Sequence, residues 1–197
     1  MMDQRQLAQM FQQGHYQDYN LSEYEFTRRF CELTRPDRIT CVGGGSNLDV
    51  FYATQGLRPA ITNWDPGQQG VARPHWHELH REYQSLTDFQ GEYTWIQQGL
   101  HDIRGLRDCD LLWLCHDQVT QHLDQIQHWP RHMIVAHYGD LTQTAALMRA
   151  HRHLPMRALG HRLAVFSRED HDWRHPNYRL AQDRALGPID PVNWIVR

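Results

Sequence analysis

Three consecutive glycines, Gly43 to Gly45, stand between a short apolar run and a segment with helical spacing. Glycine has no Cβ, so the backbone can turn sharply there and approach a ligand closely. The helix that follows offers unpaired N–H groups and the positive end of its dipole. Ser46 is a suitable N-cap for this helix, with Asp49 three residues further on. The pattern predicts a strand, a turn and a helix that together hold a small molecule.

An acidic residue, Asp65, follows the next predicted strand, 22 positions after Gly43. At the carboxyl end of a strand, a carboxylate can accept hydrogen bonds from two ribose hydroxyls. The turn and the acid together therefore predict a ligand that carries a nucleoside. A purely structural explanation stays open, because glycines also serve tight turns and Asp65 can begin the turn Asp65-Pro66-Gly67.

Three better-known motifs are missing from the glycine turn. A dinucleotide fingerprint has a third glycine where this chain has Leu48, which disfavours NAD and FAD. No Gly-Lys-Ser/Thr follows the turn, so it is not a phosphate-binding P-loop. The nucleophile elbow Gly-x-Ser-x-Gly of hydrolases is absent as well.

The elements that must position this turn alternate along the chain. Two N-terminal helices are expected between residues 4 and 33. The predicted strands are Ile39–Val42, Ala60–Trp64, Tyr93–Ile96, Asp110–Cys115, His132–Ala136, Met156–Leu159 and Arg162–Phe166, and the predicted helices run over 46–55, 75–89, 119–129 and 141–151. Only Gly160 and His161 separate the last two strands, which is too short for a helical crossover. The fold class is therefore α/β, a doubly wound, mostly parallel Rossmann-like sheet with an antiparallel C-terminal hairpin and helices on both faces.

Residues 38 to 168, with this turn and acid, resemble the class I S-adenosylmethionine-dependent methyltransferases. The resemblance implies that S-adenosylmethionine is the cofactor and that Asp65 holds its ribose. It further implies that Gly43, Gly45 and Asn47 contact its methionine part and that the segments after the third and fourth strands line the rest of the site. The cofactor-binding residues expected on this basis are Gly43, Gly44, Gly45, Ser46, Asn47, Asp65, Gln98, Gly99 and Cys115.

The methyl-transfer site of such a protein would lie at the ends of the fourth and fifth strands. A hydroxyl acceptor gains from a base, and His137 is the first choice because imidazole titrates near neutral pH. Asp117 and His116 are the next candidates. Each of the three can instead be a polar residue that simply ends a strand.

The chain departs from the family pattern at two positions. Cys41 stands where an acidic residue is usual, and Asn47 stands at the third glycine of the motif. Two alternatives to a methyltransferase therefore stay open. One is a methyltransferase-like binding protein without catalytic activity, and the other is a Rossmann-type enzyme that uses NAD or a nucleotide sugar.

Length and composition predict one domain, with a helical cap at 1–36, a cofactor-binding core at 37–168 and a tail at 169–197 packed on the core. The net charge is −3 and the arginines are scattered, so nucleic acid is disfavoured as a partner and a small-molecule substrate is favoured. No apolar run is long enough for a bilayer and no signal peptide is visible, so a cytoplasmic location is expected. The acceptor and the oligomeric state are not specified by the sequence.

Histidines and cysteines raise the question of a metal site. The densest group is His75 to His80, in which His77 and His80 would share one face of a polar helix. No second ligand pair with zinc-site spacing follows, and the four cysteines contain no CxxC pair. We therefore expect no metal, no disulfide, and a solvated surface for these histidines.

Overall fold

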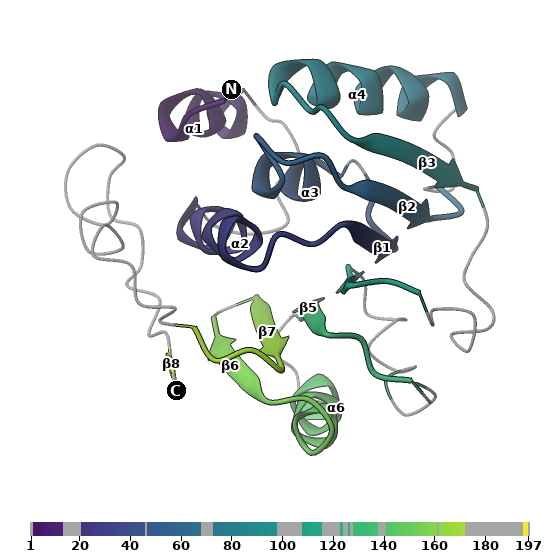
Figure 1. Cartoon of the computed structure of the whole chain (residues 1–197). Helices are drawn as coiled ribbons and strands as arrows, with labels where there is room; N and C mark the ends of the chain where they lie inside the picture. Colours follow the sequence, from purple (N-terminus) through teal and green to yellow (C-terminus); the bar gives the residue numbers. More distant parts are fainter. Residues whose placement is uncertain are drawn as a thin grey trace.

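The computed structural model describes residues 2–13, 21–45, 47–67, 73–97, 108–115, 123, 126, 128–137, 141–160, 162–171 and 195–196. Their strands form one sheet (Figure 1). The strands are β1 (Arg38–Val42), β2 (Ala60–Trp64), β3 (Glu92–Ile96), β4 (Leu111–Leu114), β5 (His132–Ala136), β6 (Met156–Leu159), β7 (Leu163–Ser167) and β8 (Ile195–Val196). Across the sheet their order is β3-β2-β1-β4-β5-β7-β6-β8.

The sheet has a parallel part and an antiparallel part. Strands β3, β2, β1, β4 and β5 are mutually parallel, whereas β7 pairs with β5 and with β6 in antiparallel fashion. This confirms the predicted fold class. Every residue of β4 and β5 is buried, as expected for central strands covered on both faces. Strand β8, within the C-terminal tail, pairs with β6.

Helices cover both faces of the sheet. Figure 1 shows α1 (Gln4–Gln12), α2 (Leu21–Thr34), α3 (Leu48–Ala53) and α4 (Arg73–Leu86) on one face and α6 (Leu141–His151) on the other. Alternate strand residues supply the two cores, because successive side chains of a strand point to opposite faces. Thus Leu111 and Trp113 pack in the core with α2 and α3, whereas Leu112 and Leu114 pack with α6.

Most predicted elements agree with the observed ones to within two residues, but the helix predicted at 75–89 differs. It runs over Arg73–Leu86. The apolar spacing of the predicted helix places Leu79, Tyr83 and Leu86 on its inward face. Tyr83 is buried, but Leu86 is 44% exposed because it lies at the end of the helix. Most of the helix predicted at 119–129 lies outside the described residues. Among the described helices, none combines the length and apolar character that a membrane span requires.

Candidate functional site at the carboxyl edge of the sheet

The glycine turn joins β1 to α3, as predicted. Gly43 and Gly45 have φ values of 70° and 51°, a left-handed conformation that non-glycine residues rarely adopt. The Gly43 N–H donates to the carbonyl of Trp64, at 2.9 Å, which ties the start of the turn to the end of β2. The turn therefore lies at the carboxyl edge of the sheet, where the parallel strands β1, β2, β4 and β5 all end.

Asn47, at the expected position of the third motif glycine, has a backbone conformation that glycine adopts readily. Its φ of 56° is again left-handed, and asparagine is among the residues that tolerate this conformation best. It also occupies the N-cap position of α3, which begins at Leu48. The prediction of Ser46 as the N-cap is therefore wrong. Asn47 makes no side-chain capping hydrogen bond: its Oδ1, the atom that would accept one, has no partner among the described residues, and its amide nitrogen donates to the hydroxyl of Tyr93.

Asp65 lies beside the turn because β2 is the parallel neighbour of β1. Its carboxylate accepts two main-chain hydrogen bonds, from the N–H of Gly45 to Oδ2 at 2.6 Å and from the N–H of Gly67 to Oδ1 at 2.7 Å. The second bond confirms that Asp65 organises the turn that follows it. The first connects the acid directly to the glycine turn, so the structural explanation and the ligand-binding explanation apply to the same carboxylate.

The inner side of the turn has no free space. A Cβ on Gly44 would lie 2.1 Å from Asn47 Oδ1 and 2.9 Å from Asn63 Oδ1. The amide groups of Asn47 and Asn63 donate to the hydroxyl of Tyr93, at 2.7 and 3.2 Å. Both asparagines are fully buried. The side chain of Asn47 thus points into the protein, and only its backbone can contact a ligand at the edge.

Helix α4 packs its first two turns over the glycine turn. His80 Nε2 lies 2.8 Å from the carbonyl oxygen of Gly45, and the indole of Trp76 approaches both Gly45 and Gly67. His80 is only 2% exposed, so the expectation of a solvated surface is wrong for His80 but holds for His77. Burial lowers the pKa of His80, although the hydrogen bond to Gly45 acts in the opposite direction. A neutral His80 is therefore expected to donate to Gly45.

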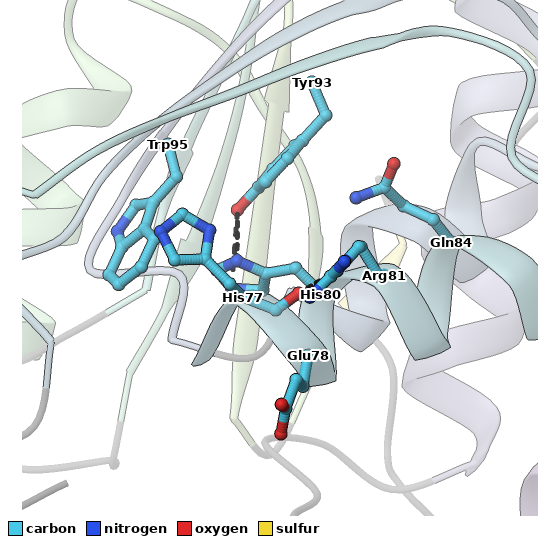
Figure 2. Close-up of a pocket in the computed structure, with 7 residues that line it drawn as sticks. All are labelled: His77, Glu78, His80, Arg81, Gln84, Tyr93 and Trp95. Atoms are coloured by element: carbon cyan, nitrogen blue, oxygen red, sulfur yellow. Dashed lines mark hydrogen bonds between the residues drawn. The ribbon is translucent and has the colours of Figure 1, made fainter. Parts of the chain in front are cut away.

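Sequence reasoning missed His80, although a signal was present. Trp76 precedes His80 by four residues and His80 precedes Tyr83 by three, so Trp76 and His80 lie on the same helical face as the buried Tyr83. Tyr93 was identified as a strand residue but not as the acceptor for two buried amides. The pKa of Tyr93 is raised by burial, which keeps its hydroxyl protonated and able to donate toward His80, 3.4 Å away (Figure 2).

The predicted residues of the methyl-transfer region are only partly within the described residues. Cys115 and His137 follow β4 and β5, which are adjacent, and both side chains are buried. The main-chain N–H of His137 donates to the carbonyl of Arg162 at 2.8 Å. The predicted residues Ser46, Gln98, Gly99, His116 and Asp117 lie outside the described part of the chain.

Two buried carboxylates near this edge were not identified from the sequence as site residues. Glu23, in the first turn of α2, accepts a hydrogen bond from the N–H of Arg162 at 2.7 Å. The main chain of Arg162 thereby connects Glu23 to His137. Asp49, in α3, is fully buried and contributes, after burial itself, to raising the pKa of Cys41. No local pattern could have revealed the contact of Glu23, since it joins residues 139 positions apart, whereas Asp49 is only eight positions from Cys41 and lies across the glycine turn from it.

Across the described residues, no group of three or more His, Cys, Asp or Glu side chains is arranged to hold a metal ion. The chemistry that these described residues offer at the edge is that of main-chain N–H groups, the carboxylate of Asp65, the buried carboxylates of Glu23 and Asp49, and buried polar side chains.

Comparison with known proteins identifies the fold. No family model matches the sequence, and no curated protein matches it. Solved structures do match: a methyltransferase from Geobacter sulfurreducens has a TM-score of 0.60 at 12% identity, over 86% of this chain and 92% of the other. The O-methyltransferase TomG from Streptomyces achromogenes has a TM-score of 0.55 at 11% identity, over 84% and 88%. A putative O-methyltransferase from Klebsiella pneumoniae has a TM-score of 0.52 at 17% identity, over 75% and 79%. The chain therefore has the Rossmann-like fold of class I S-adenosylmethionine-dependent methyltransferases.

Proposed function

We propose that this protein is a methyltransferase that binds S-adenosylmethionine at the carboxyl edge of the sheet. The observation that carries the proposal is the contact between Asp65 and the glycine turn, with Asp65 Oδ2 2.6 Å from the nitrogen of Gly45. Among the proteins with the same fold, TomG was solved with S-adenosylmethionine and the O-methyltransferase from Bacillus cereus with S-adenosylhomocysteine. The fold and the paired turn and acid support the same ligand class.

The residues at this edge fit a nucleoside. An ionised carboxylate has about four acceptor positions. The N–H groups of Gly45 and Gly67 take one on each oxygen of Asp65, which leaves one on each oxygen for the two ribose hydroxyls. A Cβ on Gly45 would meet only Trp76 among the described atoms, at 3.9 Å, so the turn is open on that side.

The other cofactor contacts in the proposal come from the residues expected from the resemblance. The backbone from Gly43 to Asn47 would hold the methionine part, Gln98 and Gly99 would line the adenine region, and Cys115 would border the transferred methyl group. Asp49 would supply the negative charge that the family usually has at the position of Cys41, since the two side chains are close enough to interact.

Bound S-adenosylmethionine supplies a methyl group that its sulfonium already activates. The protein then has to align the acceptor and exclude water. We propose His137 as the base that takes the proton of a hydroxyl acceptor, because it is buried at the end of β5, next to the end of β4. Asp117 and His116 are the alternatives. Glu23 would act as a positioning residue, because it holds the main chain of Arg162, to which His137 is hydrogen-bonded.

A second candidate is a protein that binds the cofactor without turnover. It is favoured by the hydrogen bonds that the glycine turn already makes within the protein: the N–H of Gly45 donates to Asp65, and its carbonyl is bonded to His80. Such a protein would keep the binding half of the proposal and lack the transfer step.

Calorimetry tests the cofactor binding that both candidates share and distinguishes it from the binding of NAD or a nucleotide sugar. We expect S-adenosylhomocysteine to bind and NAD and UDP-glucose to give no heat. Asp65→Ala removes the acceptor for two hydrogen bonds to the ribose, each worth about 1.5 kcal/mol or more with a charged partner, so binding should weaken about 100-fold. The matched control is Asp88→Asn. Asp88 is an exposed acid whose backbone is left-handed, a conformation that asparagine tolerates. Heat from NAD alone would refute the proposal.

Turnover is tested by incubating the protein with methyl-labelled S-adenosylmethionine and a cell extract. Label that enters the extract with the wild type but not with Asp65→Ala supports a transferase. Binding of S-adenosylhomocysteine without label transfer over a broad set of extracts supports the second candidate.

A further inference from the structure

A pocket of about 500 Å³ lies between α4 and the edge strand β3 (Figure 2). It is lined by His77, Glu78, His80, Arg81, Gln84, Tyr93 and Trp95. Helix α4 leads from the end of β2 back to the start of β3, so its later residues lie progressively farther from the carboxyl edge. The pocket therefore extends from Trp95, next to Asp65, toward Gln84, away from the glycine turn.

The walls of the pocket are fixed by hydrogen bonds to the scaffold. The indole N–H of Trp95 donates to the carbonyl of Asp65 at 2.9 Å, and His80 is bonded to the carbonyl of Gly45. Tyr93 accepts from two buried asparagines. Because these rings are held before any ligand arrives, little conformational entropy would be lost on binding.

The chemistry of the lining favours a planar, neutral ligand. The rings of Tyr93 and Trp95 form an aromatic wall. The ring of His77 meets Trp95 edge-on at 4.8 Å, and the ring of His80 meets both Tyr93 and Trp95 edge-on at 5.2 Å, so the imidazoles are part of the same wall. The formal charges of Arg81 and Glu78 cancel, and in Figure 2 Glu78 points away from Tyr93 and Trp95. Gln84 offers an amide with both donor and acceptor groups, as the edge of a nucleobase requires.

We propose that the pocket between α4 and β3 is a second ligand site that binds a neutral nucleoside, with its base against Tyr93 and Trp95 and its polar edge at Gln84. The volume lies within the range of about 300 to 1,000 Å³ that is typical of small-molecule sites. This site adjoins the proposed cofactor site, because His80 and Trp95 are bonded to the carbonyls of Gly45 and Asp65. It is nevertheless a second site, since its polar edge at Gln84 lies on a later turn of α4.

The test uses adenosine as the probe, with the full-length protein saturated with S-adenosylhomocysteine. We expect adenosine to bind under these conditions and D-ribose, which lacks the base, not to bind. Gln84→Ala should weaken adenosine binding about five- to tenfold, the equivalent of one or two neutral hydrogen bonds, and leave the affinity for S-adenosylhomocysteine unchanged. Glu82→Ala, an exposed residue of the same helix outside the pocket, is the control and should bind adenosine like the wild type.

The proposal is overturned if saturation with S-adenosylhomocysteine abolishes adenosine binding, if Gln84→Ala binds adenosine like the wild type, or if adenosine does not bind. A protein that does not take S-adenosylhomocysteine would refute the proposed function only. Adenosine would then be titrated directly into the wild type and the two variants, and the same comparison of Gln84→Ala with Glu82→Ala would decide on the second site.

Discussion

We predict that His132 makes the stability of this protein sensitive to mild acid. It is the first residue of β5, is fully buried, and lies at the edge of the sheet opposite to the candidate site. Its Nδ1 is 2.9 Å from Ser167 Oγ, and its ring packs edge-on against Phe30. Burial lowers the pKa of His132 to about 4, with Glu169 acting in the opposite direction. The fold therefore holds this side chain neutral.

The sign of the effect follows from proton linkage. Between about pH 4 and the ordinary histidine pKa of 6.5, the unfolded chain binds a proton at His132 that the folded chain does not. The free energy of unfolding is thus fully retained above pH 6.5 and falls as the pH decreases through this window. A shift from 6.5 to about 4 corresponds to a loss of about 3 kcal/mol when complete, and of about 2 kcal/mol at pH 5.

Urea unfolding at pH 7.5 and pH 5 measures this loss. The comparison variant is His132→Phe with Ser167→Ala, which removes the titrating group together with the hydroxyl bonded to it. The variant also loses the bond from the main-chain N–H of Glu169 to Ser167 Oγ, at 3.0 Å, but this loss applies at both pH values. His80, whose pKa burial also lowers, remains in both proteins. The difference in unfolding free energy between the two pH values should be about 2 kcal/mol smaller in the variant than in the wild type. Equal pH dependence in the two proteins would refute the reasoning.

Two further predictions concern the glycine turn. Gly44→Ala should reduce the free energy of unfolding by about 2 kcal/mol or more, because the new methyl group would collide with Asn47 and Asn63. Adding Asn47→Gly should recover part of this loss. A double variant no more stable than Gly44→Ala would contradict the packing argument. Tyr93→Phe should lower the free energy of unfolding, measured with urea, by about 2 to 4 kcal/mol, because the amide groups of Asn47 and Asn63 lose their common acceptor. A variant as stable as the wild type would mean that these hydrogen bonds contribute nothing to stability.

The elements around the site were predictable because their signals are local. The alternation of apolar runs and helical spacing gave β2, β5, β6 and α6 with the bounds that the structure has. The gap of two residues between the last two predicted strands required an antiparallel pair, and β6 and β7 form one, with three residues between them. The glycine turn and Asp65 were placed correctly at the ends of β1 and β2, since parallel neighbours end at one edge of a sheet. The N-cap of α3 was displaced by one residue, because both Ser46 and Asn47 are suitable cap types.

The surroundings of the turn were not predictable, because they depend on contacts between distant segments. His80 reaches Gly45 across 35 positions, Asn47 reaches Tyr93 across 46, and Glu23 reaches Arg162 across 139. In the sequence these residues look like ordinary polar residues of helices, strands and turns. Only the packing of α4 and α2 on the sheet buries them and makes their hydrogen bonds necessary.

The sequence by itself determined the class of sheet, the position of the glycine turn and the acid that follows β2, since periodicity and turn chemistry act over a few residues. The tertiary structure decided that Asp65 bonds to Gly45, that His80 is buried and that a pocket forms beside β3, since these follow from burial against elements far away in the chain.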